Sequence, residues 1–200
     1  MTETPALILA SGSPRRRDLL EEAGFRFSVA PPDIEENEDT SLPIRKLTAE
    51  NARDKAEAVA RRHPDAVVVA ADTLVLLGEQ VLSKPIDRAD AARMLAMLNG
   101  SSHEVFTAVS MRQASSEKSV DFTVTTAVHF KHLSPEEQAD YHSRIDPMDK
   151  AGAYAAQDHG ALIIERIEGS MSNVIGLPMD EVTAALESHF GITPARTAAR

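Results

Sequence analysis

One apolar run constrains the fold of this chain more than any other stretch. Residues 67–77 read VVVAADTLVLL, and only Asp72 and Thr73 interrupt the aliphatic side chains. A strand with so few polar residues is covered on both faces, as at the centre of an α/β sheet. We therefore expect residues 66–77 to form a central strand.

Asp72 is the anomaly within this run. A charged carboxylate in an apolar strand is unfavourable unless it is paired with a cation or binds a metal, so Asp72 is a candidate site residue. The alternative is that Asp72 and Thr73 only cap the end of the strand.

A second apolar segment, residues 7–9, is followed by a short polar turn and then by a helical pattern. Ser13 suits the N-cap of that helix and Pro14 its first position. A helix N-terminus presents unpaired backbone N–H groups and the positive end of the helix dipole, which favour a phosphate. An ordinary capped helix with solvated arginines is the alternative. The polar side chains around this turn are those of Ser11, Arg15 and Arg16.

The remaining segments alternate between helix and strand patterns. Helical periodicity is present at 43–62, 87–99, 134–145 and 179–190. Strand patterns are present at 25–30, 80–85, 103–111, 120–133 and 162–167. Loops and turns are predicted at 33–39 and 173–178, a loop and strand of small residues at 149–157, and a frayed tail at 193–200. Without a low-complexity linker, residues 1–200 are expected to form a single α/β domain.

The composition excludes several classes of protein. With 42% hydrophobic residues among 200 the chain can bury a substantial core, and its formal charge of -10 provides no general surface for nucleic acid or an anionic membrane. Cysteine is absent, so disulfides and thiolate metal sites are excluded. No apolar run has the length of a membrane span or the pattern of a signal peptide, so we expect a cytoplasmic protein without membrane or nucleic-acid partners.

Charged residues outside the helix turn add to the candidate site. Lys55 lies in a predicted helix, Lys84 precedes a proline, and Glu36 lies in the acidic stretch 33–39. Together with Asp72 and the arginines, this mixture suits a nucleotide polyphosphate and a divalent metal. The glycine motifs of P-loop and dinucleotide-binding proteins are absent from the sequence.

Six short motifs are distributed over nearly the whole chain. They are SGSPRR at 11–16, ADT at 71–73, KP at 84–85, the run 100–107 with His103, DKAGAYAAQ at 149–157 and NVIGLP at 173–178. In this order they resemble the signatures of the Maf nucleotide pyrophosphatases. The resemblance implies a Maf/ITPase-like fold with a mixed central sheet flanked by helices and two lobes around a cleft, often as a homodimer. It also implies hydrolysis of nucleoside triphosphates to the monophosphate and pyrophosphate with Mg²⁺ or Mn²⁺, a house-cleaning role and a link to cell-division arrest.

The resemblance also implies roles for individual residues. Asp72 matches the proton acceptor for the attacking water, although it could equally bind the metal ion and let the ion acidify that water. Glu36 matches an acidic residue that assists the metal. The positions that match the phosphate-binding groups are Ser11, Arg15, Arg16, Lys55 and Lys84.

Three positions indicate the branch of the family. A relative resembling the 7-methyl-GTP pyrophosphatases would carry tryptophan, glutamine and glutamate where this chain has Arg15, Thr73 and Gln157. The amide of Gln157 offers a donor and an acceptor to the edge of uracil or thymine, so the sequence predicts a dTTP/UTP pyrophosphatase. Ala156 and Asp158 depart from the isoleucine and glycine expected around that glutamine. The alternatives are a pyrophosphatase for another modified nucleotide and a non-catalytic nucleotide-binding regulator of division.

Overall fold

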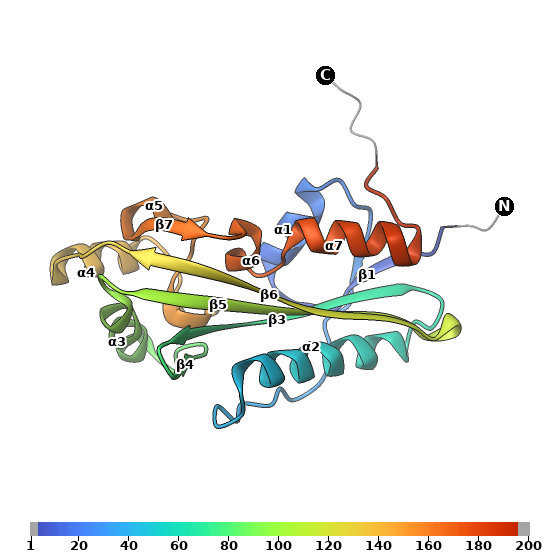
Figure 1. The fold of residues 1–200 in the computed structure, drawn as a ribbon, viewed down its shortest axis with the longest axis horizontal. Helices are drawn as coiled ribbons and strands as arrows, with labels where there is room; N and C mark the ends of the chain where they lie inside the picture. The colour runs from blue at the N-terminus through green and yellow to red at the C-terminus, as the bar shows by residue number, and fades with distance from the viewer. Residues whose placement is uncertain (1–3, 196–200) are drawn as a thin grey trace, which may run out of the picture. The chain divides into compact units, whose positions relative to one another are not determined.

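A computed structural model describes residues 4–195 of the protein (Figure 1). Its strands are β1 (Leu7–Leu9), β2 (Ser28–Val29), β3 (Val67–Leu77), β4 (Gln80–Leu82), β5 (Ser102–Gln113), β6 (Lys118–Phe130) and β7 (Ile164–Glu168). Its α-helices are α1 (Pro14–Glu22), α2 (Ile44–Ala60), α3 (Arg88–Leu98), α4 (Pro135–Ser143), α5 (Gly160–Ile163), α6 (Met171–Ile175) and α7 (Met179–Ala185). Shorter helical segments are η1 (Ala114–Ser116), η2 (Ala151–Ala153) and η3 (Leu186–Phe190). None of the described helices combines the length and the apolarity that crossing a membrane requires.

The strands form one mixed sheet in the order β2-β1-β3-β5-β6-β7, with β4 paired to β3 outside this path. β1 runs parallel to β2 and to β3. β3 and β4 are antiparallel, as are β6 and β7. The predicted class, an α/β fold with a mixed central sheet flanked by helices, is confirmed.

The chain divides into two compact units, in agreement with the two lobes of the predicted fold. Among the described residues, the first unit comprises 4–72, 107–123 and 176–195, and the second comprises 73–106 and 124–175. Strands β3, β5 and β6 contribute residues to both units.

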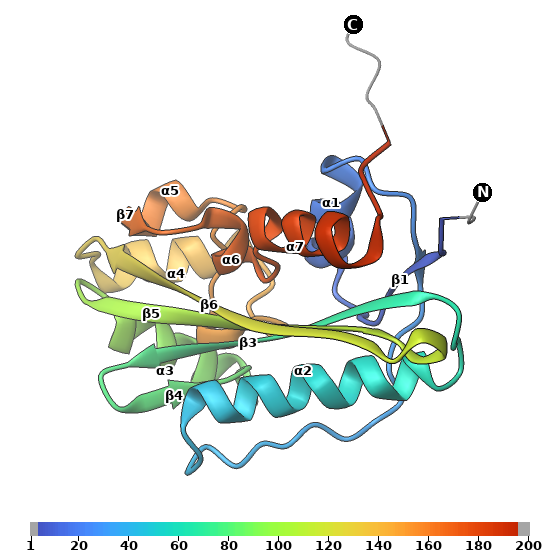
Figure 2. The same ribbon diagram turned by 45° about the vertical axis from the view of Figure 1, so that its right-hand side comes forward.

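In the first unit, β3 is covered on both faces, as its apolar sequence predicts. Val67 and Val69 pack in one cluster with residues of α1 and α7, whereas Val68 and Ala70 pack in another with residues of α2. Figures 1 and 2 show α2 on the opposite side of β1 and β3 from α1 and α7. This alternation is the period-two pattern of a strand, and it leaves no face of β3 for a solvated charge.

The second unit has its own core around the later half of β3. Buried side chains of α3 and α4, among them Leu95 and Tyr141, pack there with Val75. Three rings meet at its centre: His103 and Tyr154 both lie edge-on to Phe130, with centroid distances of 4.8 and 4.9 Å. The His103 Nε2 atom is 2.9 Å from the Tyr154 hydroxyl, so the imidazole is bonded within an apolar surrounding.

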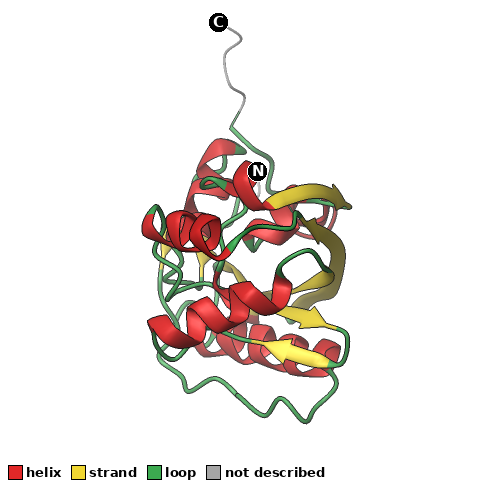
Figure 3. Ribbon diagram, turned by 90° about the vertical axis from the view of Figure 1, so that its left-hand side faces the viewer, coloured by secondary structure: helices red, strands yellow, loops and turns green. Residues whose placement is uncertain are grey.

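Several segments differ from the sequence prediction. Of the strand predicted at 25–30 only Ser28–Val29 forms, and no strand forms in the predicted loop and strand at 149–157, which contains the helical turn η2. Residues 162 and 163 belong to α5 and not to the predicted strand, and the predicted turn at 173–178 begins inside α6. The connection from residue 30 to residue 43 has no helix or strand, as its acidic composition predicts (Figure 3).

The predicted frayed tail at 193–200 lies largely outside the described residues. Of its first three residues, Ala195 donates its backbone N–H to the carbonyl of Gly24 at 2.8 Å.

His103 makes the stability of the protein depend on pH. Burial lowers the pKa of His103 from 6.5 to about 4, so between these values the unfolded chain binds more protons than the folded one. The free energy of unfolding should therefore be highest above pH 6.5 and fall as the pH decreases toward 4. A difference of about 2.5 pKa units corresponds to about 3 kcal/mol. Urea unfolding at several pH values measures this slope.

The His103→Phe variant removes the titrating group, so its free energy of unfolding should depend less on pH over the same window. The matched control is His63→Gln, because His63 is exposed and its replacement should leave the slope of the wild type unchanged. If the free energy of unfolding depends equally on pH in His103→Phe and in the wild type, His103 is not the source of that dependence.

Candidate functional site

The parallel pairing of β1 and β3 places two of the predicted site residues on neighbouring segments. Leu9 of β1 is in register with Val69 of β3, so Ser11 follows the carboxyl end of β1 while Asp72 lies three residues after Val69 within β3. Asp72 is 6% exposed, so its carboxylate is buried inside the apolar strand as the sequence indicates.

Lys55 is the cation that accompanies Asp72. Its Nζ donates to Asp72 Oδ1 at 2.8 Å and to Glu36 Oε2 at 2.6 Å, and it therefore bridges the two carboxylates. The Lys55 and Asp72 side chains are 7% and 9% exposed, so solvent screens their attraction only weakly. Asp72 Oδ2, in contrast, is buried and has no hydrogen-bond partner among the described residues.

Arg16 brings a second cation to these carboxylates. Its Nη1 donates to Ser11 Oγ at 3.2 Å and its Nε donates to the carbonyl of Gly176 at 2.8 Å. Burial lowers the pKa of Arg16, and the charges of Asp72 and Glu36 oppose that shift, which places the guanidinium within electrostatic range of both. An arginine remains charged under these conditions.

The turn before α1 differs in detail from the prediction. Ser13 is the N-cap residue and Pro14 the first helical residue, as predicted, but the side chain of Ser13 makes no capping hydrogen bond. Instead Ser11 Oγ accepts the N–H of Ser13 at 3.2 Å. Arg15 lies in the first turn of α1, and its charge contributes to the lowered pKa of Arg16.

A buried amide holds the acidic loop beside Lys55. Asn51, one turn before Lys55 on α2, accepts the N–H of Asn37 at 2.8 Å and donates to the carbonyl of Asn37 at 3.0 Å. Because Asn37 follows Glu36, these two bonds fix the backbone from which Glu36 reaches Lys55. Sequence reasoning missed Asn51, although a polar residue four positions from Lys55 on the apolar face of the helix is a signal that could have revealed it.

The other predicted residues belong to the second unit. Thr73 follows Asp72 in β3 and is partly buried. Lys84 is exposed in the segment after β4, and Gln157 is exposed with its Nε2 donating to Asp158 Oδ2 at 3.2 Å. Hydrogen bonds therefore join Ser11 to Arg16, and Lys55 to Glu36 and Asp72, and the charge of Arg16 acts on both carboxylates. The substrate-binding roles of Thr73, Lys84 and Gln157 stay predictions.

The donor set for a metal ion is small. In the part of the chain that the structure describes, no group of three or more His, Asp or Glu side chains is arranged to hold an ion. Glu36 and Asp72 supply two carboxylates, one of which retains the unpartnered Oδ2. Such a pair suits Mg²⁺, which is commonly held by one or two carboxylates together with substrate phosphates and water.

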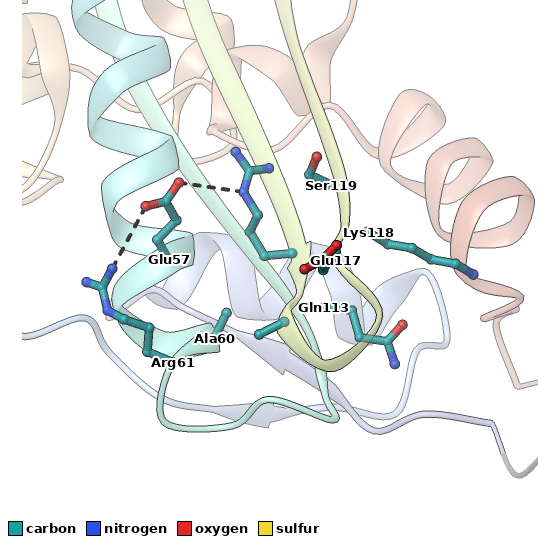
Figure 4. Close-up of a pocket in the computed structure, with 9 residues that line it drawn as sticks. Glu57, Ala60, Arg61, Gln113, Glu117, Lys118 and Ser119 are labelled. Atoms are coloured by element: carbon teal, nitrogen blue, oxygen red, sulfur yellow. Dashed lines mark ion pairs between the residues drawn. The ribbon is translucent and has the colours of Figure 1, made fainter.

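A separate pocket of about 210 Å³ lies at the end of α2, against the turn between β5 and β6. Glu57 pairs at 3.9 Å with Arg61 and at 3.9 Å with Arg112. Figure 4 shows Glu57 and Arg61 facing each other at the end of α2. It contains none of the predicted site residues. The pocket is lined by Glu57, Ala60, Arg61, Arg112, Gln113, Ala114, Glu117, Lys118 and Ser119.

Comparison with known proteins decides the family. Residues 6–189 match the family described as Maf-like protein. The chain belongs to the Maf family. This match includes every predicted site residue, from Ser11 to Gln157.

Curated relatives agree with the Maf assignment. A dTTP/UTP pyrophosphatase of Akkermansia muciniphila is 46% identical over 182 residues, which cover 91% of this chain and 95% of the relative. Proteins of the same name from Myxococcus xanthus and Salmonella typhimurium are 45% and 44% identical, covering 90% and 92% of this chain and 91% and 92% of their own lengths. Among solved structures, a HAM1 protein from Coxiella burnetii matches with a TM-score of 0.43 and 15% identity, covering 63% of this chain and 73% of that one, a likeness too weak to bear on function.

The bridge formed by Lys55 should contribute measurably to stability. Lys55→Met removes the cation but keeps an unbranched side chain, and it leaves the carboxylate of Asp72 buried without a partner. We expect the free energy of unfolding to fall by about 3 kcal/mol, as for other buried ion pairs that lose one member. Urea unfolding at neutral pH measures the change.

Lys46→Met is the matched control on the same helix. Lys46 is 56% exposed and its Nζ lies 3.7 Å from Glu50, a surface pair whose loss should change the free energy by less than about 0.5 kcal/mol. If the two variants lose equal stability, the bridge does not have the role assigned to it.

Proposed function

We propose that this protein is a nucleoside triphosphate pyrophosphatase that hydrolyses dTTP and UTP to the monophosphate and pyrophosphate. One observation carries the proposal: a buried carboxylate, Asp72, is held by Lys55 through one oxygen, and its other oxygen has no hydrogen-bond partner within residues 4–195, although it lies within electrostatic range of Arg16. The names of the curated relatives support the substrate class.

The proposed reaction is attack of water on the α-phosphorus. Asp72 Oδ2 accepts a proton from the water as its oxygen forms the new P–O bond, while the ammonium of Lys55 orients the carboxylate through Oδ1. The bond from the α-phosphorus to the bridging oxygen breaks, and pyrophosphate leaves with the electron pair. Arg15 and Arg16 compensate the negative charge of the phosphate chain.

A divalent cation fits the same residues. Mg²⁺ or Mn²⁺, when bound, would neutralise phosphate oxygens and lower the pKa of a bound water. The Glu36 carboxylate would hold it, and Asp72 Oδ2 would join it in the alternative in which the ion, and not Asp72, acidifies the attacking water. Because Lys55 already bridges these carboxylates, the remaining ligands would come from substrate and solvent.

Gln157 is the proposed reader of the base. Its amide pairs a donor with an acceptor, as the O4 and N3–H edge of uracil or thymine requires. Arg15 and Thr73 occupy the other two positions that mark this branch of the Maf family. The homodimer and the cytoplasmic location stay predictions, of which the first is tested by light scattering on the purified protein.

A nucleotide panel tests the activity directly. Purified protein with Mg²⁺ should release pyrophosphate from dTTP and UTP at a higher kcat/KM than from CTP, GTP or ATP. Asp72→Asn should lower kcat by at least about a hundredfold, because the amide cannot accept the proton of the water. The variant should still fold to the native structure by circular dichroism, because the volume of the side chain is unchanged and Lys55 keeps its hydrogen bond to Glu36.

The outcomes of the panel separate the rival functions. Release of pyrophosphate from modified nucleotides alone would show that these, and not dTTP and UTP, are the substrates. Tight binding of triphosphates without turnover would favour a non-catalytic regulator. An Asp72→Asn variant with a lowered melting temperature and an unchanged kcat would show that the carboxylate has a structural role only. Asp54→Asn, an exposed change on α2, is the control that should leave both quantities unchanged.

Removal of divalent metal should abolish the activity reversibly. With EDTA present, pyrophosphate release should stop, and it should return on addition of excess Mg²⁺ or Mn²⁺. The melting temperature without nucleotide should change little, because Lys55 compensates the carboxylates in the absence of metal. Full activity in EDTA would contradict the metal requirement.

A further inference from the structure

The segment before Gln157 is buried but belongs to no strand. Residues 152–156 are all buried, and the chain enters them through two consecutive residues with positive φ, Gly152 at 71° and Ala153 at 58°. A positive φ is unfavourable for alanine and persists only where surrounding contacts enforce it. The course of the chain toward Gln157 is therefore imposed by the side chains that contact this segment.

Tyr141 makes the most complete of these contacts. Its hydroxyl accepts the N–H of Ala155 at 2.9 Å and donates to the carbonyl of the same residue at 3.0 Å. One side chain thus satisfies both backbone groups of Ala155, as a neighbouring strand would. Tyr141 is 1% exposed, and burial raises its pKa to about 12, so the hydroxyl keeps the proton that it donates.

Neighbouring contacts fix the residues on either side of Ala155. His142, which follows Tyr141 on α4, lies with Nε2 3.0 Å from the carbonyl of Ala153. Tyr154 points to His103, with 2.9 Å between its hydroxyl and Nε2. The helix that carries Tyr141 is itself fixed at its start by a capping box of Ser134 and Glu137.

We propose that Tyr141 is a positioning residue for base selection: by holding both backbone groups of Ala155, it fixes the place from which Gln157, two residues later, reads the pyrimidine. This inference rests on the proposed function, in which Gln157 contacts the base. Gln157 itself is exposed, and its amide is oriented by Asp158 at 3.2 Å, so the rigid part of the reader is the backbone before it. If the backbone before Gln157 were mobile, its amide would not be held in the geometry that distinguishes uracil or thymine from other bases.

The Tyr141→Phe variant tests the proposal because it removes the hydroxyl and keeps the ring. In steady-state kinetics the variant should have a KM for UTP and dTTP raised by about tenfold, with kcat within about twofold of the wild type. The ratio of kcat/KM for UTP to that for CTP should fall by about fivefold or more. An unchanged ratio, or an equal loss with every nucleotide, would overturn the positioning role.

Tyr154→Phe is the matched control, since it removes a hydroxyl from the residue next to Ala155. That hydroxyl bonds His103 and not the backbone, so the control should lower thermal stability and leave the UTP to CTP ratio unchanged. A fall of the ratio equal to that of Tyr141→Phe would show that selectivity follows general stability and would overturn the proposal.

A double-mutant cycle links the effect to Gln157. In a Gln157→Ala background no reading amide remains, so the addition of Tyr141→Phe should change the ratio by less than about twofold. If Tyr141→Phe lowers the UTP to CTP ratio by the same factor with and without Gln157, the two residues act independently and the proposal is overturned. Wild-type protein that turns over neither UTP nor dTTP would overturn the proposed function itself, an outcome distinct from turnover with an unchanged ratio in the variant.

Hydrogen exchange on the wild type provides a measurement that does not require a folded variant. The Ala155 amide should exchange slowly in the protein without nucleotide, because its N–H is buried and bonded to Tyr141. Exchange as fast as that of an exposed loop amide would overturn the proposal even if Tyr141→Phe cannot be purified.

Discussion

The ammonium of Lys55 is the charge on which the geometry of the site depends. It is shared between a carboxylate in the most apolar strand of the chain and one in an acidic loop, at 2.8 and 2.6 Å. Without it, Asp72 would be a desolvated anion inside β3, an arrangement that folding disfavours strongly. The lysine lets an apolar strand carry a carboxylate and ties the loop to α2, so the fold and the proposed chemistry rest on the same contact.

The sequence predicts the elements of this arrangement better than their contacts. The apolar run places β3 with Asp72 as its anomaly, and periodicity places α2, observed as Ile44–Ala60. Periodicity assigns a residue to a face of a helix, but it does not say which side chain of another element faces it. Lys55 alone therefore reads as a surface lysine, and the roles of Asn51 and of the Gly176 carbonyl stay hidden until the chain is folded.

The segments that the sequence predicted wrongly share one physical cause. Short apolar stretches such as 149–157 and 162–167 are compatible with a strand, a turn or a helix, and local composition does not say where their backbone groups find partners. For Ala155 the partner is the hydroxyl of Tyr141 and not another strand. A side chain from another helix can thus supply the hydrogen bonds that a neighbouring strand would otherwise make. The sequence of the segment itself contains no pattern that predicts this.

The pair of hydrogen bonds between Asn51 and Asn37 divides the long connection between β2 and α2 into two loops whose lengths are constrained differently. The part before Asn37 must deliver Glu36 to Lys55, so its length is fixed by that reach. The part after it only has to return to the start of α2. The entropy of closing a loop grows slowly with its length, by about 0.6 kcal/mol for each doubling. Insertions and deletions among relatives are therefore expected to collect between residues 38 and 43, where the chain can change in length without moving Glu36 away from Lys55.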